Sequence, residues 1–185
     1  MKTVIVIHGW EGYPEEGWKP WLKKELLKKG YKVLIPSMPN TKTPKLNDWL
    51  KHLKKIVGIP NEQLILIGHS LGVITILRYL EDLKNEKIKG AILISGFSYN
   101  LEYQGYNNEL LNFFQKAVNF KKVKKHCKKF IILHSTHDPY VPIKHAYLLK
   151  EKLNAVVIIK KGTSHFSGDE GLTKLPTLLK LIEKI

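Results

Sequence analysis

The sequence predicts an α/β fold with one six-stranded, mainly parallel β-sheet and helices on both faces. Short runs of β-branched and apolar residues alternate with amphipathic segments along the whole chain. These runs are apolar at nearly every position, which is typical of strands covered on both faces. The chain has 185 residues, a length at which a single hydrophobic core usually stays undivided. We therefore expect residues 1–185 to form one domain.

The first two strands are expected near the N-terminus. Residues Thr3 to Ile7 form a continuous apolar run, which predicts a buried strand. Apolar residues recur at helical spacing from Trp18 to Leu26, and Gly30 can end that helix. Residues Tyr31 to Ile35 predict the second strand, which Pro36 ends.

The middle of the chain continues this alternation. Residues Leu46 to Val57 predict a helix that ends at Gly58. Residues Gln63 to Ile67 predict a third buried strand, and Leu71 to Leu83 the helix that follows it. Residues Ile88 to Ser95 predict the fourth strand.

The last two strands are expected at Phe130 to His134 and at Ala155 to Ile159. A helix from His145 to Leu153 separates them, and another from Leu172 to Ile185 closes the chain. Only residues 97–129 depart from the alternation of strands and helices, because this stretch is long, aromatic and basic. It holds either a small cap-like insertion over the carboxyl edge of the sheet or an ordinary crossover helix with loops.

The charge balance is strongly basic. The chain has 31 basic and 16 acidic residues, for a net charge of +15, yet Arg78 is its only arginine. Proteins that read nucleic acids rely on the bidentate fork of arginine, so we expect no nucleic-acid partner. Most lysines are expected to solvate outer helix faces, including those of the lysine-rich stretch Lys116 to Lys129.

The single cysteine, Cys127, excludes an internal disulfide framework and a cysteine-cluster metal site. No apolar run approaches the 18 or more residues of a membrane helix. The apolar run near the N-terminus is too short for the core of a signal peptide. We therefore expect a cytoplasmic protein with no membrane partner.

A nucleophile motif lies between the third strand and its helix. Residues 68–72 read Gly68-His69-Ser70-Leu71-Gly72, the G-x-S-x-G pattern of a nucleophile elbow. A strand that turns abruptly into a helix strains the corner residue and leaves room only for glycine two positions before and after it. Ser70 would then project its hydroxyl at the N-terminus of the helix, where the helix dipole favours developing negative charge.

A serine hydroxyl needs a base, and in this context the partners follow later strands in the order acid, then histidine. Asp138 follows the fifth strand and His165 follows the sixth. The carboxyl ends of parallel strands meet at one edge, so the three residues can converge. We assign Ser70 as nucleophile, His165 as general base and then acid, and Asp138 as the group that orients the imidazole.

Each partner has an alternative. Asp138 precedes a proline and could be only a turn former, and His165 could be an ordinary loop histidine. His134, His137 and His145 are rivals near the same edge, but none follows the last strand. His137 and Asp138 could suggest a metal pair, but no third ligand has useful spacing, so no metal is expected. His69 is expected to pack or form a hydrogen bond rather than to catalyse.

An oxyanion hole requires two N–H donors. One is expected at the backbone of Leu71, directly after the nucleophile. The second is expected at the backbone of Trp10, in the loop His8-Gly9-Trp10-Glu11-Gly12 after the first strand. The glycine there lets the loop backbone approach a substrate closely.

Five segments together resemble a known family. They are HGW at 8–10, WKPWL at 18–22, GHSLG at 68–72, STHDPYVP at 135–142 and SHF at 164–166. They look like the small α/β-hydrolases of the retinoblastoma-binding-protein-nine and YdeN-like serine hydrolase family, and the resemblance covers essentially the whole chain. The family usually has two acids before the proline, where this chain has His137 and Asp138. It usually has glycine before the triad histidine, where this chain has Ser164.

The resemblance implies a minimal α/β-hydrolase fold with strand order 2-1-3-4-5-6. It also implies serine-hydrolase activity, which in this family is often seen only on short artificial esters. Some members are described as partner-binding proteins, so the fold alone does not decide the function.

Aromatic residues gather on loops expected at the catalytic edge. The expected pocket residues are His8, Gly9, Trp10, Tyr13, Phe97 and Tyr140, with Tyr99 and Tyr103 nearby. They indicate either a small apolar acyl or alcohol pocket, or ordinary packing. If the lysine-rich stretch borders the site, anionic substrates would be favoured.

The sequence therefore predicts a cofactor-independent serine hydrolase that cleaves a small carboxylic ester through an acyl-enzyme intermediate. A thioester or amide substrate, or an acceptor other than water, is a variant of this hypothesis. The alternative is a partner-binding protein on a hydrolase scaffold, with a latent triad and a basic surface for an acidic partner.

Overall fold

A computed structural model describes residues 1–101 and 107–185. One six-stranded sheet has the order β2-β1-β3-β4-β5-β6, and every neighbouring pair is parallel. The strands are β1 (Thr3–Ile7), β2 (Lys32–Leu34), β3 (Leu64–His69), β4 (Gly90–Ile94), β5 (Phe130–Ser135) and β6 (Val156–Lys160). The predicted fold class and strand order are confirmed.

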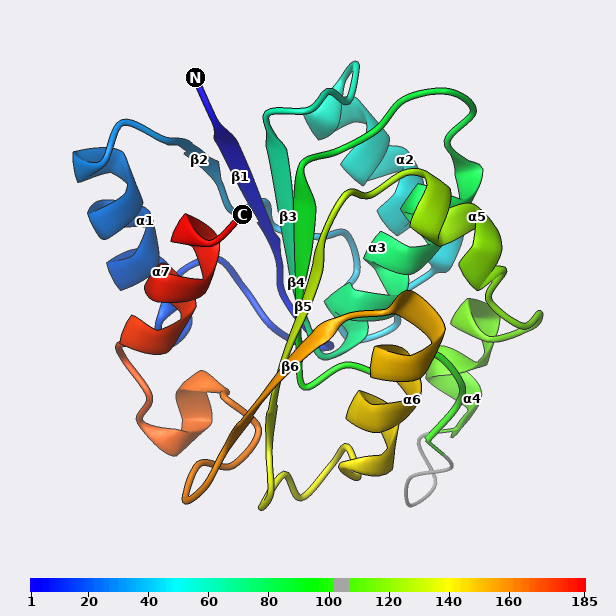
Figure 1. The fold of residues 1–185 in the computed structure, drawn as a ribbon. Coiled ribbons are helices and arrows are strands. Elements are labelled where there is room, and N and C mark those ends of the chain that lie inside the picture. The colour runs from blue at the N-terminus through cyan, green and yellow to red at the C-terminus, as the bar shows by residue number, and fades with distance from the viewer. Residues whose placement is uncertain (102–106) are drawn as a thin grey trace.

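Helices cover both faces of the sheet (Figure 1). The longer ones are α1 (Lys19–Lys28), α2 (Leu46–Val57), α3 (Leu71–Asp82), α6 (Lys144–Leu153) and α7 (Pro176–Glu183). The side chains of α1 and α7 share one buried cluster with one face of the strands. Those of α2, α3 and α6 share a larger cluster on the other face. The central strands β3, β4 and β5 are buried throughout, as their unbroken apolar runs predict.

Several element ends differ from expectation by one or two residues, and the starts of two elements shift for local reasons. The fourth strand begins at Gly90 rather than at residue 88, because Ile88 makes only an isolated bridge to Cys127. The last helix begins at Pro176 rather than at residue 172. The residues before it form a short 3₁₀ turn, η2 (Gly168–Glu170), which ends at Gly171 in the left-handed conformation.

The segment 97–129 holds short helices: α4 (Asn107–Leu110), a 3₁₀ turn η1 (Leu111–Phe113) and α5 (Phe120–Lys125). Val123 of α5 is buried, while the lysines beside it are exposed, as expected of a solvated basic face. Tyr103, expected near the catalytic edge, lies outside the described residues. Whether this segment acts as a cap stays a prediction.

The sheet topology determines where a site can form. The strand order reverses direction at the neighbouring strands β1 and β3. The loops after these strands leave toward opposite faces, which opens a crevice at the carboxyl edge. In the part of the chain that the structure describes, no helix is long and apolar enough to cross a membrane.

Candidate active site

Ser70 occupies a strained corner between β3 and α3. Its φ of 53° and ψ of −117° lie outside the regions that serine prefers. The neighbouring glycines explain how the corner can form. A Cβ atom at Gly68 would lie 2.8 Å from the backbone of Gly72, and one at Gly72 would lie 2.3 Å from the carbonyl oxygen of Ile7. Both positions therefore require glycine, as the motif predicts.

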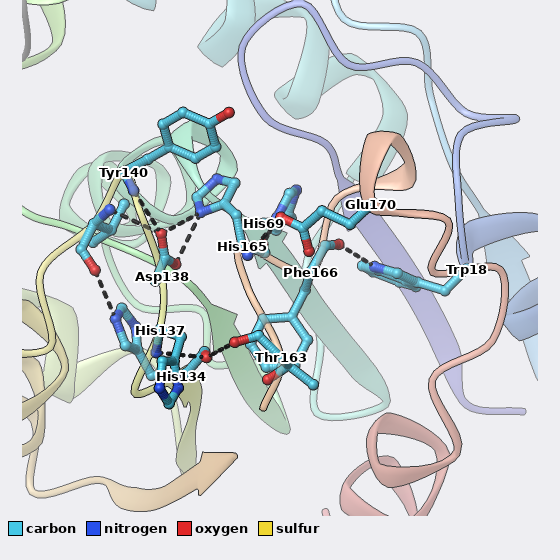
Figure 2. Close-up of polar contacts among 12 residues, drawn as sticks. Trp18, His69, His134, His137, Asp138, Tyr140, Thr163, His165, Phe166 and Glu170 are labelled. Carbon is cyan, nitrogen blue, oxygen red and sulfur yellow. Dashed lines mark hydrogen bonds and ion pairs between the residues drawn. The ribbon is translucent and has the colours of Figure 1, made fainter. Parts of the chain in front are cut away.

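His165 and Asp138 are in direct contact (Figure 2). The Nδ1 atom of His165 lies 3.0 and 2.9 Å from the two carboxylate oxygens of Asp138. The backbone N–H groups of Tyr140 and Val141 donate to Oδ1 of the same carboxylate, at 3.0 and 2.9 Å. The side chain of Asp138 is 1% exposed. This arrangement fixes the carboxylate and the imidazole against each other, and His165 and Ser70 both line one cavity.

The environment of Asp138 keeps it ionised. Burial alone would raise its pKa, but hydrogen bonding and the charge of His165 outweigh this and lower the pKa. The hydroxyl of Ser95, at the end of β4, contributes to the same lowering. Ser95 is fully buried and has a φ of 46°, and within the described residues no group lies in good hydrogen-bond geometry to its hydroxyl. Sequence reasoning missed this residue.

Three further polar contacts hold the loop that carries His165, two of them to other elements and one within the loop (Figure 2). The Nε2–H of His69 donates to the carbonyl oxygen of His165 at 2.8 Å. The indole N–H of Trp18 donates to the carbonyl oxygen of Phe166 at 2.9 Å. The backbone N–H of His165 donates to the carboxylate of Glu170 at 2.7 Å. His69 therefore has the hydrogen-bonding role that the sequence suggests.

Burial lowers the pKa of His69 to about 3, and the nearby charge of His165 lowers it further in the same direction. His69 is thus neutral at physiological pH. A neutral ring with hydrogen on Nε2 can donate to the carbonyl of His165 without adding a second positive charge beside it.

A buried ion pair holds the same loop from the side of α1. The Nζ atom of Lys19 lies 2.9 Å from one carboxylate oxygen of Glu16. The other oxygen accepts the backbone N–H of Gly168 at 3.0 Å. Burial would raise the pKa of Glu16, but the hydrogen bonds from Gly168 and Lys19 outweigh it and lower the pKa. Burial lowers the pKa of Lys19, and Glu16 partly offsets this.

The expected oxyanion donors lie beside Ser70. Leu71 is the first residue of α3, and the first amides of a helix have no acceptor inside it. The loop after β1 approaches closely, since a Cβ atom at Gly9 would lie 3.0 Å from Cβ of Ser70. Trp10 follows in that loop, and its indole N–H donates to the carbonyl oxygen of Lys42 at 3.0 Å. Leu71 and Trp10 both line the cavity.

The cavity above Ser70 has a volume of about 560 Å³. Of the expected pocket residues, Gly9, Trp10, Tyr13, Phe97 and Tyr140 line it. Sequence reasoning missed the rest of the lining beyond the predicted catalytic and oxyanion residues, namely Glu11, Gly12, Glu16, His69, Asn100, Leu101, Leu110, Val141, Ser167 and Asp169. These come from five separate segments, which only the fold brings together.

His8 is an exception among the expected pocket residues, because it does not line the cavity. The backbone N–H of Met38 donates to its Nε2 at 3.0 Å, so its Nδ1 carries hydrogen and donates to the carbonyl oxygen of Gly9 at 2.8 Å. The ring is fully buried and turned into the protein. Tyr99 also lies outside the lining and packs on His145, with ring centroids 4.4 Å apart.

The rival histidines have other surroundings. His134 is buried and donates from Nε2 to the carbonyl oxygen of Val141 at 2.9 Å. His145 is buried against Tyr99, and His137 is exposed beside Thr136. None of the three lines the cavity. Among residues 1–101 and 107–185 no group of three or more metal-ligating side chains is present.

Comparison with known proteins decides the family. The sequence model of the family described as "Serine hydrolase" matches residues 4–184. The chain belongs to the serine hydrolase family. It is 35% identical over 182 residues to the protein YdeN of Bacillus subtilis, covering 98% of this chain and 94% of YdeN. It is 29% identical over 171 residues to the serine hydrolase RBBP9 of Rattus norvegicus, covering 91% of this chain and 89% of that protein.

Solved structures agree with this membership. The crystal structure of the ydeN gene product from B. subtilis has a TM-score of 0.93 at 34% identity, covering all of this chain and 98% of that one. Est1E from Butyrivibrio proteoclasticus, solved with ferulic acid, has a TM-score of 0.73 at 18% identity, covering 99% of this chain and 90% of that one. The first match supports the family, and the second shows the shared α/β-hydrolase fold. The serine hydrolase chain is therefore an enzyme of the hydrolase class, as predicted.

Proposed function

We propose that this serine hydrolase cleaves a small carboxylic ester through an acyl-enzyme intermediate, with Ser70, His165 and Asp138 as its catalytic triad. The observation that carries the proposal is the contact of His165 with Asp138 at the cavity where Ser70 holds its strained corner. Binding alone would not require such strain at a serine.

In the first half of the reaction His165 removes the proton from the Ser70 hydroxyl, and the oxygen attacks the ester carbonyl. The backbone N–H groups of Leu71 and Trp10 stabilise the resulting oxyanion. His165 then gives the proton to the departing alcohol, and the acyl group stays on Ser70. In the second half His165 activates a water, which releases the acid and restores the serine.

Asp138 supports both halves. Its carboxylate accepts the Nδ1–H of His165, so Nε2 is free to take the serine proton, and it stabilises the imidazolium that forms. No cofactor or metal has a role in this scheme. The proposed binding partner is a small ester molecule. We also propose a cytoplasmic location, because a single buried cysteine that forms no disulfide is typical of proteins in reducing compartments.

The test is labelling with a fluorophosphonate probe, which traps only an activated serine, together with turnover of p-nitrophenyl butyrate. The parent and the His137→Ala variant should be labelled and active, because His137 is exposed and outside the cavity. Ser70→Ala and His165→Ala should lose both signals, with a fall in turnover of roughly 10³-fold or more. If the folded parent is not labelled, the triad proposal fails and the partner-binding alternative becomes the better explanation.

A further inference from the structure

The lining of the active cavity has an unusual charge for this protein. The chain has 31 basic residues, yet among the described residues no lysine or arginine lines the cavity. Residues 102–106, which the structure does not describe, contain no basic residue either. Three acidic residues line the cavity instead, namely Glu11, Glu16 and Asp169.

These carboxylates come from two loops that pack against each other. Glu11 and Glu16 lie on the loop between β1 and α1, and Asp169 lies in η2, after His165. The loops meet at Gly17 and Gly168, where a Cβ atom on Gly17 would lie 3.0 Å from the Cα of Gly168. The backbone N–H of Gly168 also donates to Glu16. The acidic part of the wall is thus continuous and is built on the same contacts that hold His165.

Only part of this negative charge is balanced. Lys19 forms an ion pair with Glu16 at 2.9 Å and interacts only through longer-range electrostatics with Asp169, and both Glu11 and Asp169 are exposed residues of the lining. His69 is neutral, because burial and the neighbouring His165 hold its pKa at about 3. The lysine-rich stretch 116–129 contributes nothing to the lining, so the anionic preference that the sequence suggested for a bordering basic helix has no support.

The overall positive charge does not cancel this local field. Surface charges farther than about 8 Å are largely screened at physiological salt, whereas groups at the cavity act directly on a bound ligand. The aromatic rings of Trp10, Tyr13 and Tyr140 also line the cavity, and the faces of such rings attract cations. The remaining wall is mostly apolar, with Phe97, Leu101, Leu110 and Val141.

We propose that the cavity selects esters that carry an ammonium group, on either the acyl or the alcohol side, and disfavours anionic esters. This inference rests on the proposed function, since it names the substrate class of the same site. Glu11 and Asp169 are the specificity-determining residues, because they are the exposed acids of the lining, whereas Glu16 forms an ion pair with Lys19. The apolar wall and the aromatic rings receive the methyl or methylene groups around the cation.

The test uses pairs of esters of equal shape. On the acyl side, the cationic substrate is the p-nitrophenyl ester of 4-(trimethylammonio)butanoate and its neutral partner is the p-nitrophenyl ester of 5,5-dimethylhexanoate. Mono-p-nitrophenyl glutarate serves as the anionic substrate. On the alcohol side, acetylcholine is compared with 3,3-dimethylbutyl acetate. We expect kcat/KM for the cation to exceed that for its neutral partner by roughly tenfold in at least one pair. The ratio should shrink as salt is added.

The double variant Glu11→Gln with Asp169→Asn should bring the cation-to-neutral ratio close to one. The matched control, Asp82→Asn with Glu151→Gln, removes the same charge from two helix positions that do not line the cavity and should keep the parent ratio. A parent that hydrolyses the neutral esters without preferring the cation in either pair would overturn this inference alone. A parent that hydrolyses none of the esters and resists the fluorophosphonate would overturn the proposed function instead.

Discussion

Ser70 and Ser95 both hold a positive φ, and both lie at the carboxyl ends of neighbouring strands. A non-glycine residue in this region stores strain, which persists only where the surrounding structure enforces it. At Ser70 the strain exposes the proposed nucleophile. At Ser95 it accompanies a buried hydroxyl that helps to keep the Asp138 carboxylate ionised. We infer that Ser95 positions Asp138 rather than touching substrate.

The first prediction concerns Ser95→Ala. Loss of the hydroxyl removes a group that favours the charged form of Asp138, so the pKa of this carboxyl should rise. The shift can be measured by ¹³C NMR titration of the carboxyl carbon. Ser98→Ala, at another buried serine on the loop that follows β4, is the control and should leave the titration unchanged. An unshifted curve in Ser95→Ala would show that the hydroxyl does not act on Asp138.

At the scale of the elements, the position of the loop after β6 is fixed by contacts with the segment that leads into α1. Trp18 holds Phe166, and Glu16 holds Gly168 while pairing with the buried Lys19. This connection spans some 150 residues of sequence, from the first helix to the histidine loop. It explains why the WKPWL segment accompanies the catalytic motifs, since its first residues position the loop that carries His165.

The second prediction is a double-mutant cycle on the buried ion pair. Glu16→Gln leaves the Lys19 ammonium buried without its partner and should lower the free energy of unfolding by roughly 3–5 kcal/mol. Adding Lys19→Met removes the buried charge, so the double variant should regain most of that loss. Urea unfolding of the parent, both single variants and the double variant measures the coupling free energy between the two side chains. Strictly additive effects would mean that the two side chains do not act as a pair.

At the scale of the whole molecule, four buried histidines link stability to pH. Burial lowers the pKa of His8, His69, His134 and His145 from the ordinary 6.5, to about 3 for His69 and about 4 for His145. Below pH 6.5 the unfolded chain takes up protons at these positions while the folded protein does not, so stability falls as the pH falls. The lowered pKa values of Asp138 and Glu16 act in the same direction at lower pH still.

The third prediction tests this linkage at His145, whose side chain is buried against Tyr99. The parent should lose stability steeply between pH 7.5 and 5. His145→Phe cannot take up the proton in the unfolded state, so its loss over this range should be smaller by about 2 kcal/mol. Urea unfolding at both pH values measures the difference. His137→Phe, at an exposed histidine, should follow the parent, and an equally steep loss in His145→Phe would refute the assignment.

Local patterns in the sequence determined the fold class and the identity of the serine, acid and histidine candidates, whereas the strand order was expected only from the family resemblance. These were accessible because buried parallel strands are apolar at every position, and because the G-x-S-x-G corner requires glycines at fixed spacing. The strand ends and the start of the last helix shifted by a few residues, since local turns such as η2 follow from tertiary contacts.

Tertiary structure alone decided the environment of the site. His8 has the residue type and position of a pocket residue, but its hydrogen bond from Met38 turns the ring away from the cavity. Glu11, Glu16 and Asp169 are unremarkable loop acids in the sequence, and they form one acidic wall only because two loops far apart in the chain pack together. Charge composition could not reveal this, because a net charge of +15 counts residues and not their distances from the cavity. The field at a binding site depends on those distances and on screening.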